Sequence, residues 1–235
     1  MKKALFASAT LALTLASPFC SADIQPAPVK STGVTSAQLM KRAAVDWVTV
    51  DEIKQSLKGK PPMAVGLDID DTTLFSSPGY FRGKMEYSPN SDAYLKNPAF
   101  WKKMNGGWDN FSIPKTIAKK LIKMHEARGD TIYFITARPY TKGEKVTAII
   151  KRDFHIKNMK PVIFADKSKA NPLDKTDNLK KYHIKLYYGD ANADMTSARA
   201  AGARGIRVMR AANSAFYPLP NNGKYGEEVI ANSQV

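Results

Sequence analysis

Residues 63–72 read MAVGLDIDDT, an apolar run that ends in a cluster of acids. The run Met63–Leu67 predicts a short buried strand. Side chains alternate along a strand, so we expect Asp68 and Asp70 on one side and Ile69 on the other. Two carboxylates this close repel each other, and a metal cation or a shared proton is therefore expected between them. Oxygen ligands favour hard ions, magnesium before zinc.

Three further features agree with an acidic site at the ends of strands. Thr136-Ala137-Arg138 follows a predicted strand, Asp190 follows another with Asp194 four residues later, and Lys175 lies 15 residues before Asp190. Each feature alone has a simpler interpretation. The acids at 68–71 could form a calcium loop or a capped turn. Thr136, Asp190 or Asp194 could cap a helix, and Lys175 could be a solvated lysine. Their order and their common place at strand ends favour catalysis.

Strand and helix patterns alternate along the chain. Strands are predicted at 63–67, 131–135, 161–165, 184–188 and 205–209. Helices are predicted from the capping box of Thr49 and Glu52 to about Leu57, from Ser112 and Pro114 to Gly129, around 146–150, and over 193–201. This alternation predicts an α/β fold with a doubly wound, Rossmann-like parallel sheet, in which Asp68 follows a central strand.

The segment from about 75 to 111 differs in composition from its surroundings. It holds nine of the chain's 23 aromatic residues and is rich in Gly, Pro, Asn and Ser. We expect a small cap inserted after the first core strand, overhanging the site, because ligands of open α/β sheets lie beyond the carboxyl ends of the strands. The aromatics could also form a mini-core, and the two interpretations are compatible. Tyr80, Trp101 and the later Phe216 are candidates to stack on a base or aryl ring.

Length and composition limit the class of protein. The chain has 235 residues, of which 43% are hydrophobic and 24% charged, with a formal net charge of +15. These values exclude a disordered, collagen-like or coiled-coil chain. The single cysteine, Cys20, excludes an internal disulfide and a cysteine zinc cluster.

The first 22 residues have the pattern of a secretory signal peptide. Lys2 and Lys3 precede an apolar run, and Cys20-Ser21-Ala22 places small residues before cleavage at Asp23. A buried N-terminal helix is the alternative, whereas the residues before Cys20 disfavour lipidation. Cleavage would lower the net charge from +15 to +13 and remove the cysteine, which suits an oxidising compartment. We predict a periplasmic protein without a membrane anchor, whose domain (23–235) begins with an arm (23–60).

The order of these strand-end residues resembles the haloacid-dehalogenase-like phosphohydrolases, and the whole mature chain resembles the class B bacterial acid phosphatases. The resemblance is carried by Pro61–Gly66, Asp68–Thr72, Phe75–Gly79, Asn97-Pro98, Gly107–Asp109, Phe111–Lys115, Pro161–Ala165, Tyr188–Asp190, Gly202–Arg207 and Gly226–Ile230.

The resemblance implies a role for each strand-end residue. Asp68 would be the nucleophile that forms an aspartyl-phosphate, and Asp70 the general acid and then base. Thr136, Ala137 and Lys175 would bind the phosphoryl group, with Arg138 beside them. Magnesium would be held by Asp68, the Asp70 carbonyl and Asp190, with Asp194 in the outer shell. Ala137 stands where the family often has glycine.

The resemblance also implies substrates and assembly. We expect hydrolysis of a broad range of phosphomonoesters, including nucleoside monophosphates and aryl phosphates, phosphotransfer to alcohols, and a homotetramer. A narrower nucleotidase of the same superfamily is the alternative within enzymes. Residues 141–185 hold 12 Lys or Arg against five acids, so a nucleic-acid-binding protein is the alternative from another class. That alternative leaves the strand-end acids unexplained. We expect a nucleic acid to interact only as a substrate, through its end.

Overall fold

The computed structural model describes residues 45–157, 159–165 and 171–234. The predicted signal peptide, and the predicted arm up to residue 44, lie outside the described residues. Among the helices of the described ranges, none has both the length and the apolar character that crossing a membrane requires.

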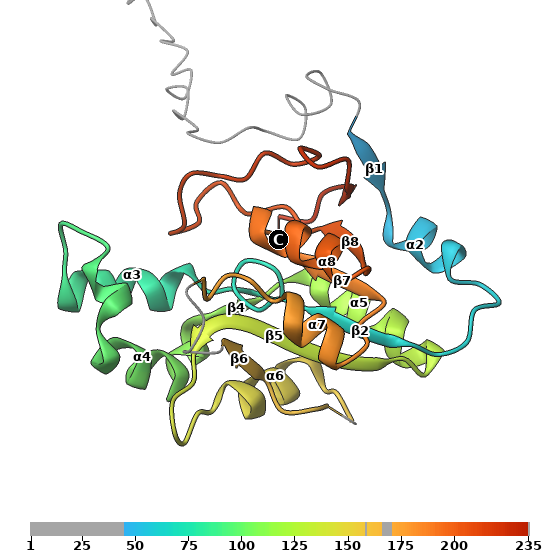
Figure 1. Cartoon of the computed structure of the whole chain (residues 1–235). Helices are drawn as coiled ribbons and strands as arrows, with labels where there is room; N and C mark the ends of the chain where they lie inside the picture. Colours follow the sequence, from blue (N-terminus) through green and yellow to red (C-terminus); the bar gives the residue numbers. More distant parts are fainter. Residues whose placement is uncertain (1–44, 158, 166–170, 235) are drawn as a thin grey trace, which may run out of the picture. The chain divides into compact units, whose positions relative to one another are not determined.

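Seven strands form one parallel sheet in the order β1-β9-β8-β7-β2-β5-β6 (Figure 1). The strands are β1 (Asp46–Val48), β2 (Ala64–Leu67), β5 (Thr131–Pro139), β6 (Ile163–Ala165), β7 (Leu186–Gly189), β8 (Arg204–Arg207) and β9 (Glu228–Ile230). The helices that accompany them are α2 (Val50–Ser56), α5 (Thr116–Arg128), α6 (Val146–Phe154), α7 (Thr176–Lys181) and α8 (Asn192–Ala200). The predicted α/β fold with a doubly wound parallel sheet is confirmed.

Strand β2 occupies the centre of the sheet, as predicted. It pairs with β5 on one side and β7 on the other, so that Leu67 lies opposite both Phe134 and Tyr188. The Asp68 N–H extends the ladder by one step, donating to the carbonyl of Tyr188 at 2.9 Å. The chain therefore leaves the sheet at Asp68 with its backbone still fixed by the neighbouring strand.

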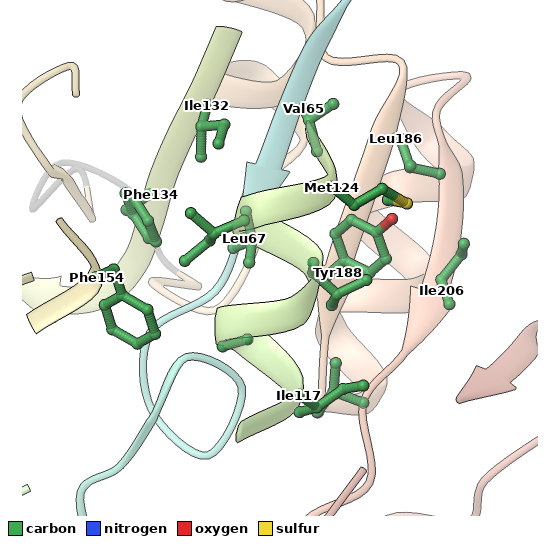
Figure 2. Packing of buried hydrophobic residues seen from close by; sticks show 14 of the residues in the cluster. Val65, Leu67, Ile117, Met124, Ile132, Phe134, Phe154, Leu186, Tyr188 and Ile206 are labelled. Atoms are coloured by element: carbon green, nitrogen blue, oxygen red, sulfur yellow. The ribbon is translucent and has the colours of Figure 1, made fainter. Parts of the chain in front are cut away.

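Helices cover both faces of the sheet. On one face, Leu67 and Tyr188 pack in the main core cluster with α5 residues such as Ile117 and Met124 (Figure 2). On the other face, Tyr187 packs with residues of α7 and α8. Adjacent Tyr187 and Tyr188 belong to opposite clusters because side chains alternate along β7. Because both faces of the sheet are buried, the central strands β2 and β7 contain no charged residue.

The segment after β2 forms the expected cap. After the short β3 (Leu74–Phe75), it contains α3 (Ser77–Tyr87), η1 (Ala93–Lys96), α4 (Pro98–Asn105) and η2 (Trp108–Phe111), and it returns to the sheet through β4 (Ile113–Pro114). In Figure 1 α3 and α4 lie beside one another, away from the helices that cover the sheet. Tyr80, Tyr94, Phe100 and Met104 are buried together, with Trp101, Trp108 and Phe216 packed against them. The aromatics therefore do form a mini-core.

Two predicted boundaries were wrong. Helix α5 begins at Thr116 rather than at Ser112 or Pro114, because Ile113 and Pro114 pair with β3 as an antiparallel strand. Strand β5 runs to Pro139 rather than ending at Ile135, with an irregular register against β6 beyond that residue. Thr136, Ala137 and Arg138 therefore belong to the strand itself.

The parallel sheet extends beyond the strand predicted at 205–209. Strands β1 and β9 pair with each other beyond it, and β9 also pairs with β8. Each has three residues, which is too short for an alternating pattern to stand out in the sequence.

Candidate active site

Three buried acids meet at the carboxyl ends of β2 and β7. Asp68 follows β2, Asp190 follows β7, and Asp194 lies in the first turn of α8. Each offers a carboxylate oxygen, and these oxygens all lie within 4.8 Å of one another. Burial raises the pKa of Asp68, the Lys175 ammonium opposes this rise, and the carboxylates of Asp194 and Asp190 add to it. A cation at this cluster would favour the ionised carboxylates.

Lys175 joins two of these acids. Its Nζ lies 2.5 Å from Asp68 Oδ1 and 2.7 Å from Asp194 Oδ1, and only 4% of the residue is exposed. Burial lowers the pKa of Lys175, but Asp194 and Asp68 outweigh burial and raise it well above its usual value. Lys175 is therefore a fixed positive charge. Asp68 Oδ2 receives no hydrogen bond from the described residues and remains available to a ligand.

Asp70 has a different set of partners. Arg138 donates to it from Nε at 2.8 Å and from Nη2 at 2.6 Å, Ser76 Oγ donates at 2.5 Å, and the Tyr80 hydroxyl at 3.1 Å. Burial raises the pKa of Asp70, but the charge of Arg138 and these hydrogen bonds outweigh burial and lower it. Asp68 and Asp70 have opposite pKa shifts because only Asp70 faces an arginine.

Asp190 is held by a residue that the sequence analysis did not identify. Arg210 pairs with Asp190 Oδ2 at 2.6 Å, and its Nη1 donates to the carbonyl of Phe216 at 3.0 Å. Thr72 Oγ1 donates to the other oxygen, Asp190 Oδ1, at 3.0 Å. Arg210 lies three residues after β8, so a basic residue beyond a predicted strand was the available signal.

A pocket of about 330 Å³ opens onto these charges. Its lining includes ten of the eleven predicted site residues: Asp68, Asp70, Tyr80, Trp101, Ala137, Arg138, Lys175, Asp190, Asp194 and Phe216. Thr136 is the predicted site residue that is not among the described residues lining the pocket. It is buried in β5, where its hydroxyl accepts a hydrogen bond from the N–H of Arg138 at 3.2 Å.

The three predicted aromatics lie together on one side of this pocket. The Tyr80 ring packs edge-on against Phe216, with centroids 4.6 Å apart, and against Trp101 at 6.0 Å. Tyr80 is only 2% exposed, so its ring faces are covered and its hydroxyl reaches Asp70. Trp101 and Phe216 are partly exposed and offer apolar surface to a ligand.

The arrangement suits transfer of a phosphoryl group. A carboxylate free to attack, a second carboxylate beside it, a fixed ammonium and an all-oxygen cluster for a hard cation converge in one pocket. Positioning and charge neutralisation are what phosphoryl transfer requires. Placed at the carboxyl ends of a parallel sheet under a cap, this set defines a haloacid-dehalogenase-like phosphohydrolase.

Comparison with known proteins identifies the family. Residues 9–219 match the model of the HAD superfamily, subfamily IIIB (acid phosphatase). The chain is 58% identical over 205 residues to the class B acid phosphatase of Salmonella arizonae, with 86% of each chain covered. It is 54% identical over 232 residues to that of Klebsiella pneumoniae, with 97% of each covered. The chain belongs to the class B acid phosphatases.

A solved structure supports the fold. The protein resembles a haloacid dehalogenase-like family hydrolase from Streptococcus pneumoniae with a TM-score of 0.50 and 11% identity, over 73% of this chain and 95% of that one. At this identity the likeness concerns the fold alone. The predictions of an acid phosphatase and of its superfamily are confirmed.

Proposed function

We propose that the protein is a magnesium-dependent acid phosphatase that hydrolyses a broad range of phosphomonoesters through an aspartyl-phosphate. The observation that supports this most directly is the shared pocket, where Asp68 and Asp70 lie with Lys175 and the three-carboxylate cluster. The roles of the two acids are those that the family resemblance implies, and a cation at the carboxylate cluster would favour the ionised form of Asp68 that attack requires.

In the first half-reaction, a carboxylate oxygen of Asp68 attacks phosphorus and the bond to the ester oxygen breaks. Asp70 donates its proton to that leaving oxygen, so an alcohol departs. In the second, water attacks the phosphorus of the aspartyl-phosphate, Asp70 accepts a proton from it, and Asp68 is released with inorganic phosphate. Lys175 and the Ala137 backbone hold phosphoryl oxygens, and an alcohol in place of water completes a phosphotransfer.

The direction of the Asp70 pKa shift sets the pH dependence. Asp70 must carry a proton when the ester bond breaks, and Arg138 holds its pKa below the usual value. The competent fraction therefore falls as pH rises through that lowered pKa, and acid conditions restore it. This direction agrees with an acid phosphatase.

The residues present fit a hard divalent cation, because the three clustered side chains offer only carboxylate oxygens. Asp68, Asp190 and the Asp70 carbonyl would hold it, with Asp194 outside them. The ion supplies positive charge that offsets repulsion between Asp68 and an anionic substrate. The side chains themselves place the nucleophile, the proton donor and the ammonium.

Substrate range follows from the walls of the pocket. Trp101 and Phe216 present apolar surface next to the acids, and stacking on such rings is tolerant of the base or aryl group. Nucleoside monophosphates and aryl phosphates therefore suit the pocket, and the phosphorylated end of a nucleic acid would enter only as a substrate. A narrower nucleotidase would use the same rings, and turnover ratios on several monoesters separate the two.

Location and assembly are part of the proposal. The N-terminal signal-peptide pattern supports export to the periplasm, and the family membership supports a homotetramer. Reading the N-terminal residue of the secreted protein tests the first. Sedimentation of the mature protein tests the second.

Asp68→Asn tests the covalent step. It keeps the size of the side chain but removes the nucleophile, so phosphate release from p-nitrophenyl phosphate should fall by several orders of magnitude in a folded protein. Asp92→Asn is the matched control, because Asp92 is an exposed acid of the cap, paired only with Lys84 among the described ion pairs. Near-normal turnover by D68N would remove Asp68 as the nucleophile.

A further inference from the structure

The Arg138 guanidinium lies between two carboxylates. Its Nε and Nη2 donate to Asp70 at 2.8 and 2.6 Å, and its Nη1 and Nη2 donate to Asp109 at 2.6 and 2.9 Å. A guanidinium is planar and its donors are fixed in a fork, so each carboxylate occupies one edge of the same plane. The orientation of that plane is therefore set from both sides.

Asp109 comes from the cap and is the more deeply buried of the two acids. It lies in η2, it is 0% exposed, and Ser112 Oγ donates to its Oδ1 at 3.1 Å. Asp70 lies at the pocket, where a ligand competes for it, whereas Asp109 is absent from the pocket lining among the described residues. The cap end of the bridge is thus the end that lies outside the described lining of the pocket.

We propose that Asp109 is a positioning residue for the phosphatase reaction: it fixes the Arg138 guanidinium, and through it the Asp70 carboxyl, in the orientation that proton transfer needs. The proposal rests on the role of Asp70 given above. Asp109 itself touches no reacting atom.

The physical reason is the geometry of the fork. Without Asp109, Arg138 keeps its attraction for Asp70 but loses the second edge that stops the guanidinium from tilting. Ser76 and Tyr80 still donate to Asp70, but the two Arg138 donors that set the plane of its carboxylate shift with the guanidinium. A misplacement of about 1 Å can cost about 10²-fold in rate. The same bridge links the cap to strand β5, so the cap contributes to the placement of the acid as well as to the walls of the pocket.

Three substitutions test the proposal on the full chain. Asp109→Asn removes the charge, Asp109→Glu keeps the charge but displaces it by one methylene, and Asp92→Asn is the control with the same change elsewhere in the cap. We expect D109N and D109E to lower kcat for p-nitrophenyl phosphate by about 10- to 10²-fold, with KM changed less than about threefold. D92N should keep the wild-type values.

D109E separates positioning from a structural role. A role limited to neutralising the buried Arg138 would leave kcat intact in D109E, whereas positioning predicts its loss. Melting temperatures establish that each variant is folded. If D109N does not fold, D109E carries the test, because it leaves no buried charge unpaired. A folded D109N or D109E with kcat within twofold of wild type overturns the proposal.

A double-mutant cycle identifies the route through Arg138. In an Arg138→Met background, D109N should cost no further turnover, because the guanidinium through which Asp109 is proposed to act is gone. Losses that multiply would show that Asp109 acts by another route and would also overturn the proposal. Asp70→Asn tests the acid assignment separately: wild-type turnover by D70N would refute that assignment, while the cycle would still report whether Asp109 acts through Arg138.

Discussion

Gly189→Ala should disturb the acid cluster although it replaces no charged residue. Gly189 ends β7 directly before Asp190. A Cβ added there would lie 2.5 Å from Asp194 Oδ2, and closer still to the Cβ and Cγ of the same side chain. The φ of Gly189 lies outside the left-handed region, so alanine meets no backbone strain and the clash is the whole effect.

The size of the effect follows from the displacement. Ordinary van der Waals contact begins at 3.4 Å, so Asp194 would have to move by about 1 Å. Its Oδ1 accepts from Lys175 at 2.7 Å and its Oδ2 from the Ala191 N–H at 3.0 Å, and both bonds would be disturbed. We expect kcat/KM to fall by about 10²-fold. The concentration of divalent cation needed for half-maximal activity should rise by about 10- to 100-fold.

Gly205→Ala is the matched control. A Cβ on Gly205 would also press on α8, at 3.0 Å from Ala198, but one strand away from the acids. Crowding of this kind costs about 1–3 kcal/mol of stability, so both variants should melt lower, and only G189A should lose turnover and cation affinity. The assay is phosphate release over a magnesium titration. Wild-type kinetics in G189A would refute the placement of Asp194 in the cluster.

Two other predictions concern the cation and the core. EDTA should abolish turnover and added magnesium should restore it, measured as phosphate release after gel filtration; indifference to the chelator would remove the cation from the proposal. His125 is fully buried between Asp130 and the Tyr188 hydroxyl, and burial, opposed by Asp130, lowers its pKa below 6.5. Because the unfolded chain binds the proton first, stability present above pH 6.5 is lost as pH falls toward the folded pKa. The melting temperature should therefore drop on mild acidification, and His125→Gln should flatten that drop; an equally steep drop in H125Q would contradict it.

The strand-end residues could be predicted because their signal is local. An apolar run followed directly by acids, as at Leu67 and Asp68, predicts a buried strand and a site at its end from a few neighbouring residues. The parallel sheet then brings Asp68 and Asp190 together without further information, since parallel strands end at one edge. Lys175, in a polar loop, gave no such signal alone and depended on the family resemblance.

The residues that were missed act through contacts distant in sequence. Arg210 matters because it pairs with Asp190, and Asp109 because it pairs with Arg138 across 29 positions. Arg210 follows a predicted strand, but that position alone does not distinguish it from a solvated charge, and the neighbours of Asp109 give no signal at all. The start of α5 was misplaced for a similar reason, because the partner that holds Ile113 in a strand is Phe75.

The charge balance of the site argues for a divalent cation independently of the family. Around the pocket, the carboxylates of Asp68, Asp70, Asp71, Asp109, Asp190 and Asp194 face four buried or half-buried cations, Lys115, Lys175, Arg138 and Arg210. If all six acids were ionised, they would leave two negative charges beyond the four bases in a region that water reaches poorly, where unpaired charge is costly. Protonation could offset them in part, because burial raises the pKa of Asp68 and, together with Asp190, raises that of Asp71 to about 7. A divalent cation would offset both charges and would leave Asp68 ionised, as the proposed nucleophile must be.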